Sequence, residues 1–408
     1  MSSLPIRRGE LVALIAMMFA TIAFSIDAML PALPEIAEAL TPENVNAAQL
    51  ILTVFVLGMG LGTFVTGPLS DAYGRKKVVL GGCALYITAA IVAAQAQSLE
   101  VLLAARLVQG LGAAGPRVVA LAIIRDLVSG REMARIMSFV LVVFTLVPAL
   151  APSLGAVIIA FAGWRGIFGA FVLFSVISAV WLTVRLPETH PPEARRPLRF
   201  GALVEAAREM FGHPIVRLSI LVQSLTLGIM FAMLSSVQQV YDMTFGRGDE
   251  FPLWFGAVAI CAGAASFLNA RIVVKLGMRR IITTILSLQV VASGVMILLS
   301  LISLPETAYF ATFVIWQATV FFMIGLSVGN LNAIAMEPLG HIAGLAASLI
   351  GAISTVAAVI LAVPVGLMFD GTPLPLACAI FVEAALAVTL MRGMRRIEAE
   401  TEAAPAAA

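Results

Sequence analysis

The sequence is poor in charged residues, which make up 12% of its 408 residues, whereas 61% are apolar. A soluble globule of this length needs more polar side chains to cover its surface. The composition therefore excludes a water-soluble protein and indicates that lipid surrounds most of the chain. The net charge of +2 indicates no particular partner, and we expect the lipid bilayer but no nucleic acid among the partners.

Cysteine and histidine are also scarce, with three residues of each. The cysteines fall in separate apolar segments, so neither a disulfide framework nor a metal cluster is indicated. The histidines, His190, His213 and His341, lie in predicted loops, there is no H-E-x-x-H motif, and no serine or cysteine has a clear base partner. We therefore predict no metal, no cofactor and no enzyme such as an intramembrane protease or acyltransferase.

Long apolar runs dominate instead, each close to the roughly 20 residues that a membrane-spanning helix needs. The twelve runs cover 11–31, 49–69, 78–96, 101–124, 135–160, 164–184, 215–238, 252–273, 281–303, 308–335, 342–367 and 373–391. The first run follows Arg7 and Arg8 as in a signal peptide, but it continues past Asp27 without a clear cleavage site. The sequence predicts an all-α membrane protein with twelve transmembrane helices.

The positive charges predict the orientation of these helices. With a cytoplasmic N-terminus, 21 of the 25 lysines and arginines fall in the two terminal segments and the cytoplasmic loops. Only Arg165 and Arg247 fall in loops on the other side, and Arg106 and Arg117 lie within the fourth span. Because cytoplasmic loops are enriched in Lys and Arg, we expect a multi-pass inner-membrane protein with both termini in the cytoplasm.

A partial internal repeat divides the spans into two sets of six. GPLSDAYGRKKVV at 67–79 has a weaker copy, ARIVVKLGMRRII, at 270–282. Two related halves predict pseudo-symmetric six-helix bundles that rock around a central site, an arrangement that disfavours a passive channel. The predicted parts are an N-terminal bundle at 1–186, a cytoplasmic linker at 187–214, a C-terminal bundle at 215–394 and a disordered cytoplasmic tail at 395–408.

Several motifs resemble one transporter family. GPLSDAYGRKKV resembles the loop motif between helices 2 and 3 of the major facilitator superfamily, and RLVQGLGAAG in the fourth span resembles its twelve-span drug/H⁺ antiporters. DAMLPALPEI, GWRGIF and MEPLGHIAGLAASLIGA resemble the bicyclomycin/chloramphenicol resistance (Bcr/CflA) subgroup. The resemblance implies a monomeric proton-coupled antiporter that exports small amphipathic compounds. The fifth span departs from the antiporter pattern G-P-x-x-G-G, with APSLGA at 151–156.

The residues themselves point to proton coupling. A charged side chain inside a span costs about 3 kcal/mol on insertion scales and therefore needs a partner or water. Asp27 near the end of the first span and Arg106 near the start of the fourth lie at similar depth, so we expect an ion pair between them. Movement of the arginine would change the affinity of the carboxylate for a proton. The alternative interpretation of Asp27 is an exposed helix end.

Polar residues within spans are the candidate lining of a substrate cavity. Arg106, Gln109, Gly110 and Arg117 share one helical stripe that we expect to face the cavity. The predicted cavity residues are Gln109, Arg117, Gln223, Asn330 and Asn332. Packing between helices is the alternative for each of them. The predicted sites of helix flexing are Gly110, Pro148, Pro152 and Gly155.

The repeated loop is the candidate cytoplasmic gate. The resemblance implies that Gly67 permits close helix approach and that Asp71 caps a neighbouring helix or pairs across the gate. The predicted gate residues are Gly67, Asp71, Gly74, Arg75, Lys76 and Glu337, although simple anchoring by positive charge is the alternative. Glu383, midway along the twelfth span, has no place in this scheme, and we interpret it as a protonated or paired structural carboxyl.

The function predicted from these features is export of drugs or antibiotics in exchange for protons. A proton-coupled symporter that imports a small metabolite is the alternative, because Asp27 and Arg106 would serve transport in either direction.

Overall fold

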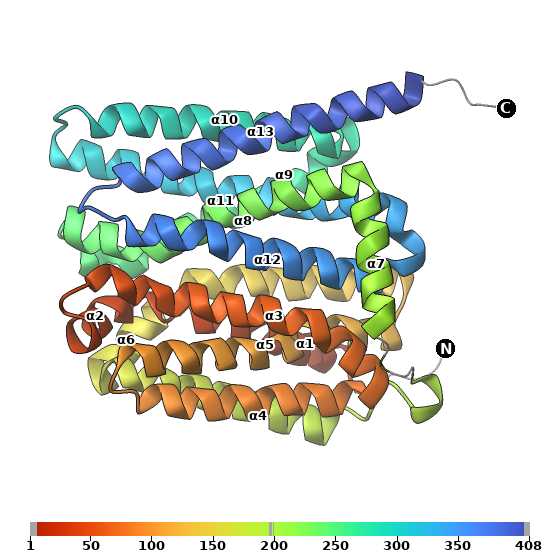
Figure 1. The fold of residues 1–408 in the computed structure, drawn as a ribbon. Coiled ribbons are helices and arrows are strands. Elements are labelled where there is room, and N and C mark those ends of the chain that lie inside the picture. The colour runs from red at the N-terminus through yellow and green to blue at the C-terminus, as the bar shows by residue number, and fades with distance from the viewer. Residues whose placement is uncertain (1–5, 196–197, 199, 404–408) are drawn as a thin grey trace. The chain divides into compact units, whose positions relative to one another are not determined.

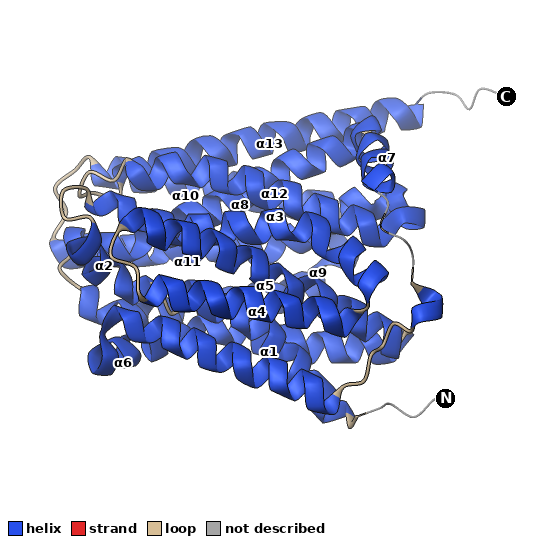
Figure 2. Cartoon of the chain, turned by 60° about the horizontal axis from the view of Figure 1, so that its bottom comes forward, coloured by secondary structure: helices blue, strands red, loops and turns tan. Residues whose placement is uncertain are grey.

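The computed structural model describes residues 6–195, 198 and 200–403, and within these residues the regular structure is helical. Figure 2 shows long helices joined by short loops. The helices are α1 (Arg8–Asp27), α2 (Leu33–Leu40), α3 (Leu50–Tyr73), α4 (Arg75–Ala94), α5 (Leu99–Leu127), α6 (Gly130–Arg185), α7 (Phe200–Gly212), α8 (Pro214–Gln239), α9 (Phe251–Leu276), α10 (Met278–Ser300), α11 (Glu306–Met336), α12 (Ala343–Leu367) and α13 (Leu374–Ala403). Short 3₁₀ or π turns lie at Leu30–Ala32, Val45–Gln49, Pro192–Ala194, Val240–Thr244, Gly248–Glu250 and Glu337–Ile342.

Ten stretches of the described chain are long and apolar enough to cross a membrane, and two of them hold a pair of spans. Leu146–Arg185 contains a break at Gly163, where φ is 62°, and Glu306–Leu367 contains the 3₁₀ turn Glu337–Ile342 between α11 and α12. Glycine tolerates this positive φ because it has no Cβ. The predicted all-α architecture with twelve spans is confirmed.

The chain divides into two compact units. Unit 1 comprises Met1–Phe200 with Asp249–Ala257, and unit 2 comprises Gly201–Gly248 with Val258–Ala408. The boundary at Phe200 lies inside the segment 187–214 that the sequence predicts as a linker.

In unit 1, α5 packs between α3 and α4, and α1 packs against α6 (Figure 1). Glycines allow the closest approaches. A Cβ added to Gly110 of α5 would overlap the carbonyl oxygen of Phe55 in α3, and one added to Gly112 would lie 2.6 Å from the carbonyl oxygen of Gly82 in α4. Lipid provides no hydrophobic drive between helices, so small residues at the contacts hold such a bundle together.

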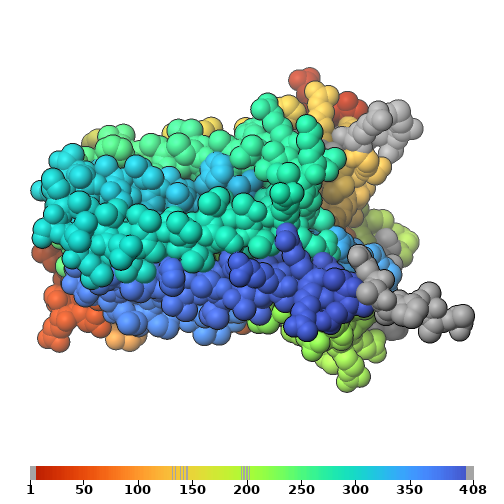
Figure 3. Space-filling model, turned by 90° about the horizontal axis from the view of Figure 1, so that it is seen from above, coloured from red at the N-terminus to blue at the C-terminus, as the bar shows by residue number. Residues whose placement is uncertain are grey.

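In unit 2, α8 is the central helix and packs against α11, α12 and α13. Figure 3 shows α10 and α13 side by side on one face of this unit. Large apolar side chains on the outer helices are exposed, among them Phe267, Val291, Ile315 and Ile360. A surface of this kind suits lipid and would promote aggregation in water.

The C-terminal segment differs from the sequence prediction. Helix α13 continues to Ala403, whereas the sequence predicts a disordered tail from 395, and residues 404–408 lie outside the described part. The tail RRIEAETEA is rich in good helix formers, and Arg396 pairs with Glu400 at a distance of 2.8 Å one turn later. Both features favour continuation of the helix.

Candidate functional site

Unit 1 contains a buried polar cluster around Arg106, whose side chain is fully buried in α5. Its Nη2 donates to the carbonyl oxygen of Ser25 in α1 at 3.0 Å, and its Nε donates to the carbonyl oxygen of Ile51 in α3 at 3.2 Å. Its Nη1 donates to Oε1 of Gln109 at 2.8 Å, and the guanidinium lies 4.3 Å from the centre of the Phe55 ring. Arg106 thus joins three helices, and carbonyl dipoles and a ring face stabilise its charge.

The expected ion pair between Asp27 and Arg106 is wrong for this structure. Asp27 is the last residue of α1 and only 5% exposed, but no ion pair or hydrogen bond joins it to Arg106 among the described residues. The two positions are close along the helix axes, yet the guanidinium points to the backbone of Ser25, two residues before Asp27. The similar depth of Asp27 and Arg106 in the membrane therefore predicted that the two residues lie near each other, but not where their side chains point.

Ser25 extends this cluster through its hydroxyl group. Its Oγ donates to the carbonyl oxygen of Thr21 at 2.6 Å and shares a hydrogen bond with the hydroxyl of Tyr86 in α4. The Nε2 of Gln109 is buried beside the hydroxyl of Tyr86 and forms no hydrogen bond of good geometry among the described residues. An unsatisfied buried amide donor is costly, which makes Gln109 a candidate to bind an acceptor on a substrate.

Two predicted flexing glycines occupy close helix contacts. Gly110 meets the backbone of Phe55, as described above, and a Cβ on Gly155 of α6 would overlap the carbonyl oxygen of Ala28, the residue after Asp27. Gly155 therefore lets α6 approach α1 beside Asp27. Pro148 and Pro152 lie one turn apart inside the same helix α6. Whether any of these residues bends during transport stays a prediction.

Arg117 lies about three turns after Arg106 on α5 and is half-buried. Its described polar contact is a long one, from Nη1 to Sδ of Met59 at 3.5 Å. Because a thioether is a weak acceptor, this guanidinium keeps most of its hydrogen-bonding capacity for another group. It remains a candidate cavity residue.

The predicted cavity residues of unit 2 have different surroundings. Gln223 of α8 is 2% exposed, and its Oε1 has no hydrogen-bond partner among the described residues. Asn330 of α11 forms a reciprocal amide pair with Asn269 of α9, with N–O distances of 2.8 and 3.4 Å. Asn332 is half-buried. The pair with Asn269 fits contact between helices, so Gln223 has the better claim to a ligand.

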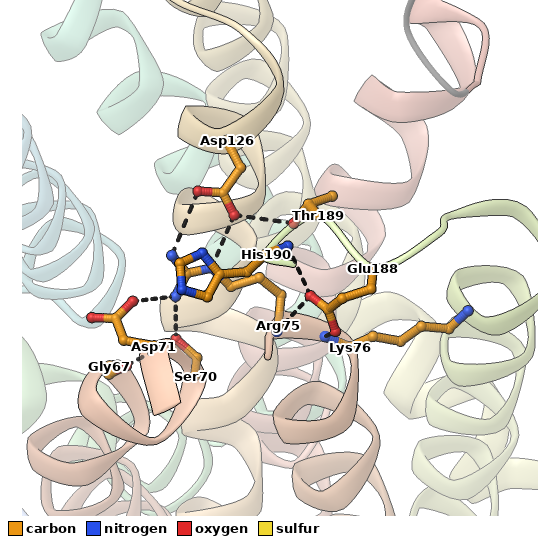
Figure 4. Close-up of polar contacts among 9 residues, drawn as sticks. All are labelled: Gly67, Ser70, Asp71, Arg75, Lys76, Asp126, Glu188, Thr189 and His190. Carbon is orange, nitrogen blue, oxygen red and sulfur yellow. Dashed lines mark hydrogen bonds and ion pairs between the residues drawn. The ribbon is translucent and has the colours of Figure 1, made fainter. Parts of the chain in front are cut away.

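A second cluster lies at the turn between α3 and α4 (Figure 4). Arg75 forms an ion pair with Asp71, donates from Nη1 to Oγ of Ser70 at 2.8 Å, and donates from Nε to Oδ2 of Asp126 at 3.0 Å. Gly67 lies one turn before Asp71, and its carbonyl oxygen accepts from Ser70 at 2.9 Å. The side chain of Arg75 therefore holds the end of α3 against the end of α5.

The same turn binds a carboxylate from the segment that follows α6. The backbone N–H groups of Arg75 and Lys76 donate to Oε1 and Oε2 of Glu188 at 2.9 and 3.1 Å. Lys76 reaches back through Nζ to the carbonyl oxygens of Thr183 and Leu186 at 2.7 and 3.0 Å. A carboxylate at a helix N-terminus and a cation at a helix C-terminus are both favourable for the helix dipoles.

Gly74 makes the turn possible and confirms the repeat at the level of the backbone. Its φ and ψ are 97° and 154°, and those of Gly277 before α10 are 78° and 148°. Glycine adopts this region without the steric cost that a Cβ brings. The two positions that the sequence repeat aligns therefore have the same conformation.

Glu337 belongs to a different cluster, in unit 2. It pairs with Nη2 of Arg279 at 2.8 Å, and Nε of Arg279 also pairs with Glu398 of α13 at 2.5 Å. These networks also contain four residues that were not predicted from the sequence: Asp126, Glu188, Arg279 and Glu398. A signal was available for the first two, because each acid follows the end of an apolar run at the same membrane face as the basic loop 75–77.

Glu188→Gln is expected to lower the stability of the purified chain by about 1 kcal/mol, because the amide keeps one acceptor but loses the charge at the N-terminus of α4. Thermal unfolding measures the loss. Glu193→Gln, at an exposed position of the same segment, is the matched control and should leave the melting temperature unchanged. Equal melting of the two variants would contradict the role assigned to Glu188.

Comparison with known proteins identifies the family. The model of the Major Facilitator Superfamily matches residues 13–362. The chain is 32% identical over 338 residues to the bicyclomycin resistance protein homolog of Haemophilus influenzae, covering 81% of this chain and 82% of that protein. It is 38% identical over 165 residues to the chloramphenicol resistance protein of Pseudomonas aeruginosa, covering 40% and 39%. The names of these relatives confirm the resemblance to the Bcr/CflA subgroup.

Solved structures confirm the fold. The crystal structure of a D-xylose-proton symporter matches with a TM-score of 0.73 at 15% identity, covering 93% of this chain and 96% of that one. At this identity the match shows a shared fold alone. The spans, the repeat and the family match lead to one conclusion: this chain is a multi-pass membrane protein and belongs to the Major Facilitator Superfamily of transporters.

Proposed function

We propose that the chain is a proton-coupled antiporter that exports small amphipathic compounds, including antibiotics, across the inner membrane. Support for export comes from the relatives named for bicyclomycin and chloramphenicol resistance. Support for proton coupling comes mainly from one observation: Asp27 is a buried carboxyl group without an ion pair in the described structure, two residues from the backbone group that binds Arg106. In this proposal both termini are cytoplasmic.

The energetics of a single proton suit this role. Inward movement of one proton across about 100 mV and about one pH unit releases about 3.7 kcal/mol. That energy sustains a gradient of roughly 500-fold for a neutral compound. Proton binding at Asp27 would change the local charge beside the cluster around Arg106, which links α1, α3 and α5. All three helices belong to unit 1, and alternating access in transporters of this kind is largely the rocking of one bundle against the other.

Proton-coupled import of a small metabolite is the second candidate. One of the solved structures with the same fold is a D-xylose-proton symporter, so the fold itself is compatible with either direction. Asp27 and Arg106 would serve proton-coupled transport in both directions. The direction therefore requires a transport measurement.

Respiring everted membrane vesicles provide the test, with chloramphenicol and bicyclomycin as the probes. Their interior is acidic, so an antiporter takes up the added compound, releases protons and discharges the pH gradient. Vesicles without the chain provide the control. A symporter would not discharge the gradient under these conditions. Absence of discharge by every compound to which the chain gives cells resistance would overturn the export proposal.

A further inference from the structure

In the described part of unit 2, Glu383 is the buried charged residue, and the proposed transport mechanism does not use it. It lies near the middle of the apolar part of α13 and is 7% exposed. Carboxyl groups in such positions are rare within membrane spans and usually carry a function or have a partner.

The carboxyl group faces α8 without a polar partner. Its Oε2 is buried and has no hydrogen-bond partner in the described structure. A Cβ added to Gly228 of α8 would lie 3.1 Å from this oxygen and 3.3 Å from side-chain atoms of Leu361 in α12. Glu383 therefore occupies a space that the missing side chain of Gly228 leaves between helices.

Among the residues that the structure describes, no cation lies near enough to neutralise an ionised Glu383. The helices that pack on α13 are α8, α10 and α12, and α12 has no charged residue. The charged residues of the other two are Arg217, Arg279 and Arg280, all in the first turns of their helices. Arg217 is eleven residues, or about 16 Å of helix, before Gly228. On α13 itself the closest charged residue is Arg392, nine residues later, and Cys378 is exposed.

We infer that Glu383 is a second proton-binding site, located at the contact of α13 with Gly228 of α8 and separate from Asp27. The neutral acid fits this apolar contact, whereas the ionised form would leave a charge there without a partner. Proton binding at Glu383 therefore stabilises the packing of α8 against α13. The inference concerns the folded chain alone and does not depend on the transported compound.

Thermal unfolding of the purified full chain from acidic to alkaline pH tests this inference. Glu383→Gln keeps the shape of the side chain and mimics the protonated form. We expect wild type and variant to melt at similar temperatures at acidic pH. Wild type should then fall below the variant as the pH rises, because a proton held by the folded state is lost. Glu38→Gln, at an exposed position of α2, is the matched control and should follow wild type at every pH.

Infrared difference spectra between wild type and Glu383→Gln give the direct readout. We expect a band from a protonated carboxylic acid that disappears as the pH rises. Glu383→Met, also uncharged and similar in length, replaces the glutamine variant if that variant does not fold. Wild type and variant with the same melting curve at every pH, or a difference spectrum without that band, would overturn the inference. Stabilisation by sodium over choline only when Glu383 is present would also overturn it, in favour of a metal-cation site.

Discussion

Asp27→Asn is expected to reduce drug-dependent proton release from everted vesicles to the level of vesicles that lack the chain. The amide has nearly the same size as the carboxyl group but cannot bind and release a proton. The described structure shows no ion pair of Asp27 that the substitution would break, so the variant should insert and fold normally. Loss of coupling with an unchanged melting temperature therefore distinguishes a transport role from a structural one.

Asp27→Glu and Glu38→Gln are the controls for this prediction. The first retains a titratable carboxyl group one methylene further from α1 and should keep part of the proton release. The second removes an exposed carboxyl group of α2 and should keep all of it. Unaltered proton release by Asp27→Asn would remove Asp27 from the mechanism.

The positions of the spans were the most predictable feature of the sequence. The predicted run 215–238 agrees to within one residue at each end with α8 (Pro214–Gln239). The predicted run 342–367 agrees equally well with α12 (Ala343–Leu367). The cost of exposing polar backbone to lipid makes apolar length a strong constraint, so the ends of these helices follow the sequence closely. The position at which the charged C-terminal end of α13 stops was less predictable. Outside the apolar region, only helix propensity and charge pairs determine where a helix ends.

The candidate site was predictable as a set of residues but not as a set of contacts. The place of Arg106 in an apolar span predicts that its side chain is buried. It does not predict which groups bind the side chain. The sequence favoured a carboxylate as the partner of Arg106, whereas in the structure its partners are the backbone carbonyl groups of Ser25 and Ile51. Backbone acceptors have no sequence signature, since every residue carries one. For the same reason the binding of Glu188 to two backbone N–H groups of α4 was missed.

Arg106→Ala is expected to destabilise the chain by about 3 to 5 kcal/mol, because each buried acceptor that loses its donor costs about 1 to 3 kcal/mol and the cavity left by the side chain adds to the loss. The substitution removes the bonds to Ser25 and Ile51, leaves Oε1 of Gln109 without its donor, and opens a cavity against Phe55. Thermal unfolding of the purified chain measures the loss. Arg117→Ala on the same helix is the matched control and should change the melting temperature little, because its described polar contact is only with Met59.

Arg106→Lys separates the charge of this residue from its geometry. Lysine keeps the positive charge, but its single ammonium group cannot reproduce the planar fork with which Arg106 reaches α1 and α3 together. We therefore expect a stability between that of wild type and that of Arg106→Ala, and proton-coupled transport much weaker than that of wild type. If lysine restored both stability and transport, charge alone would suffice, and the role of Arg106 as the link between three helices would be wrong.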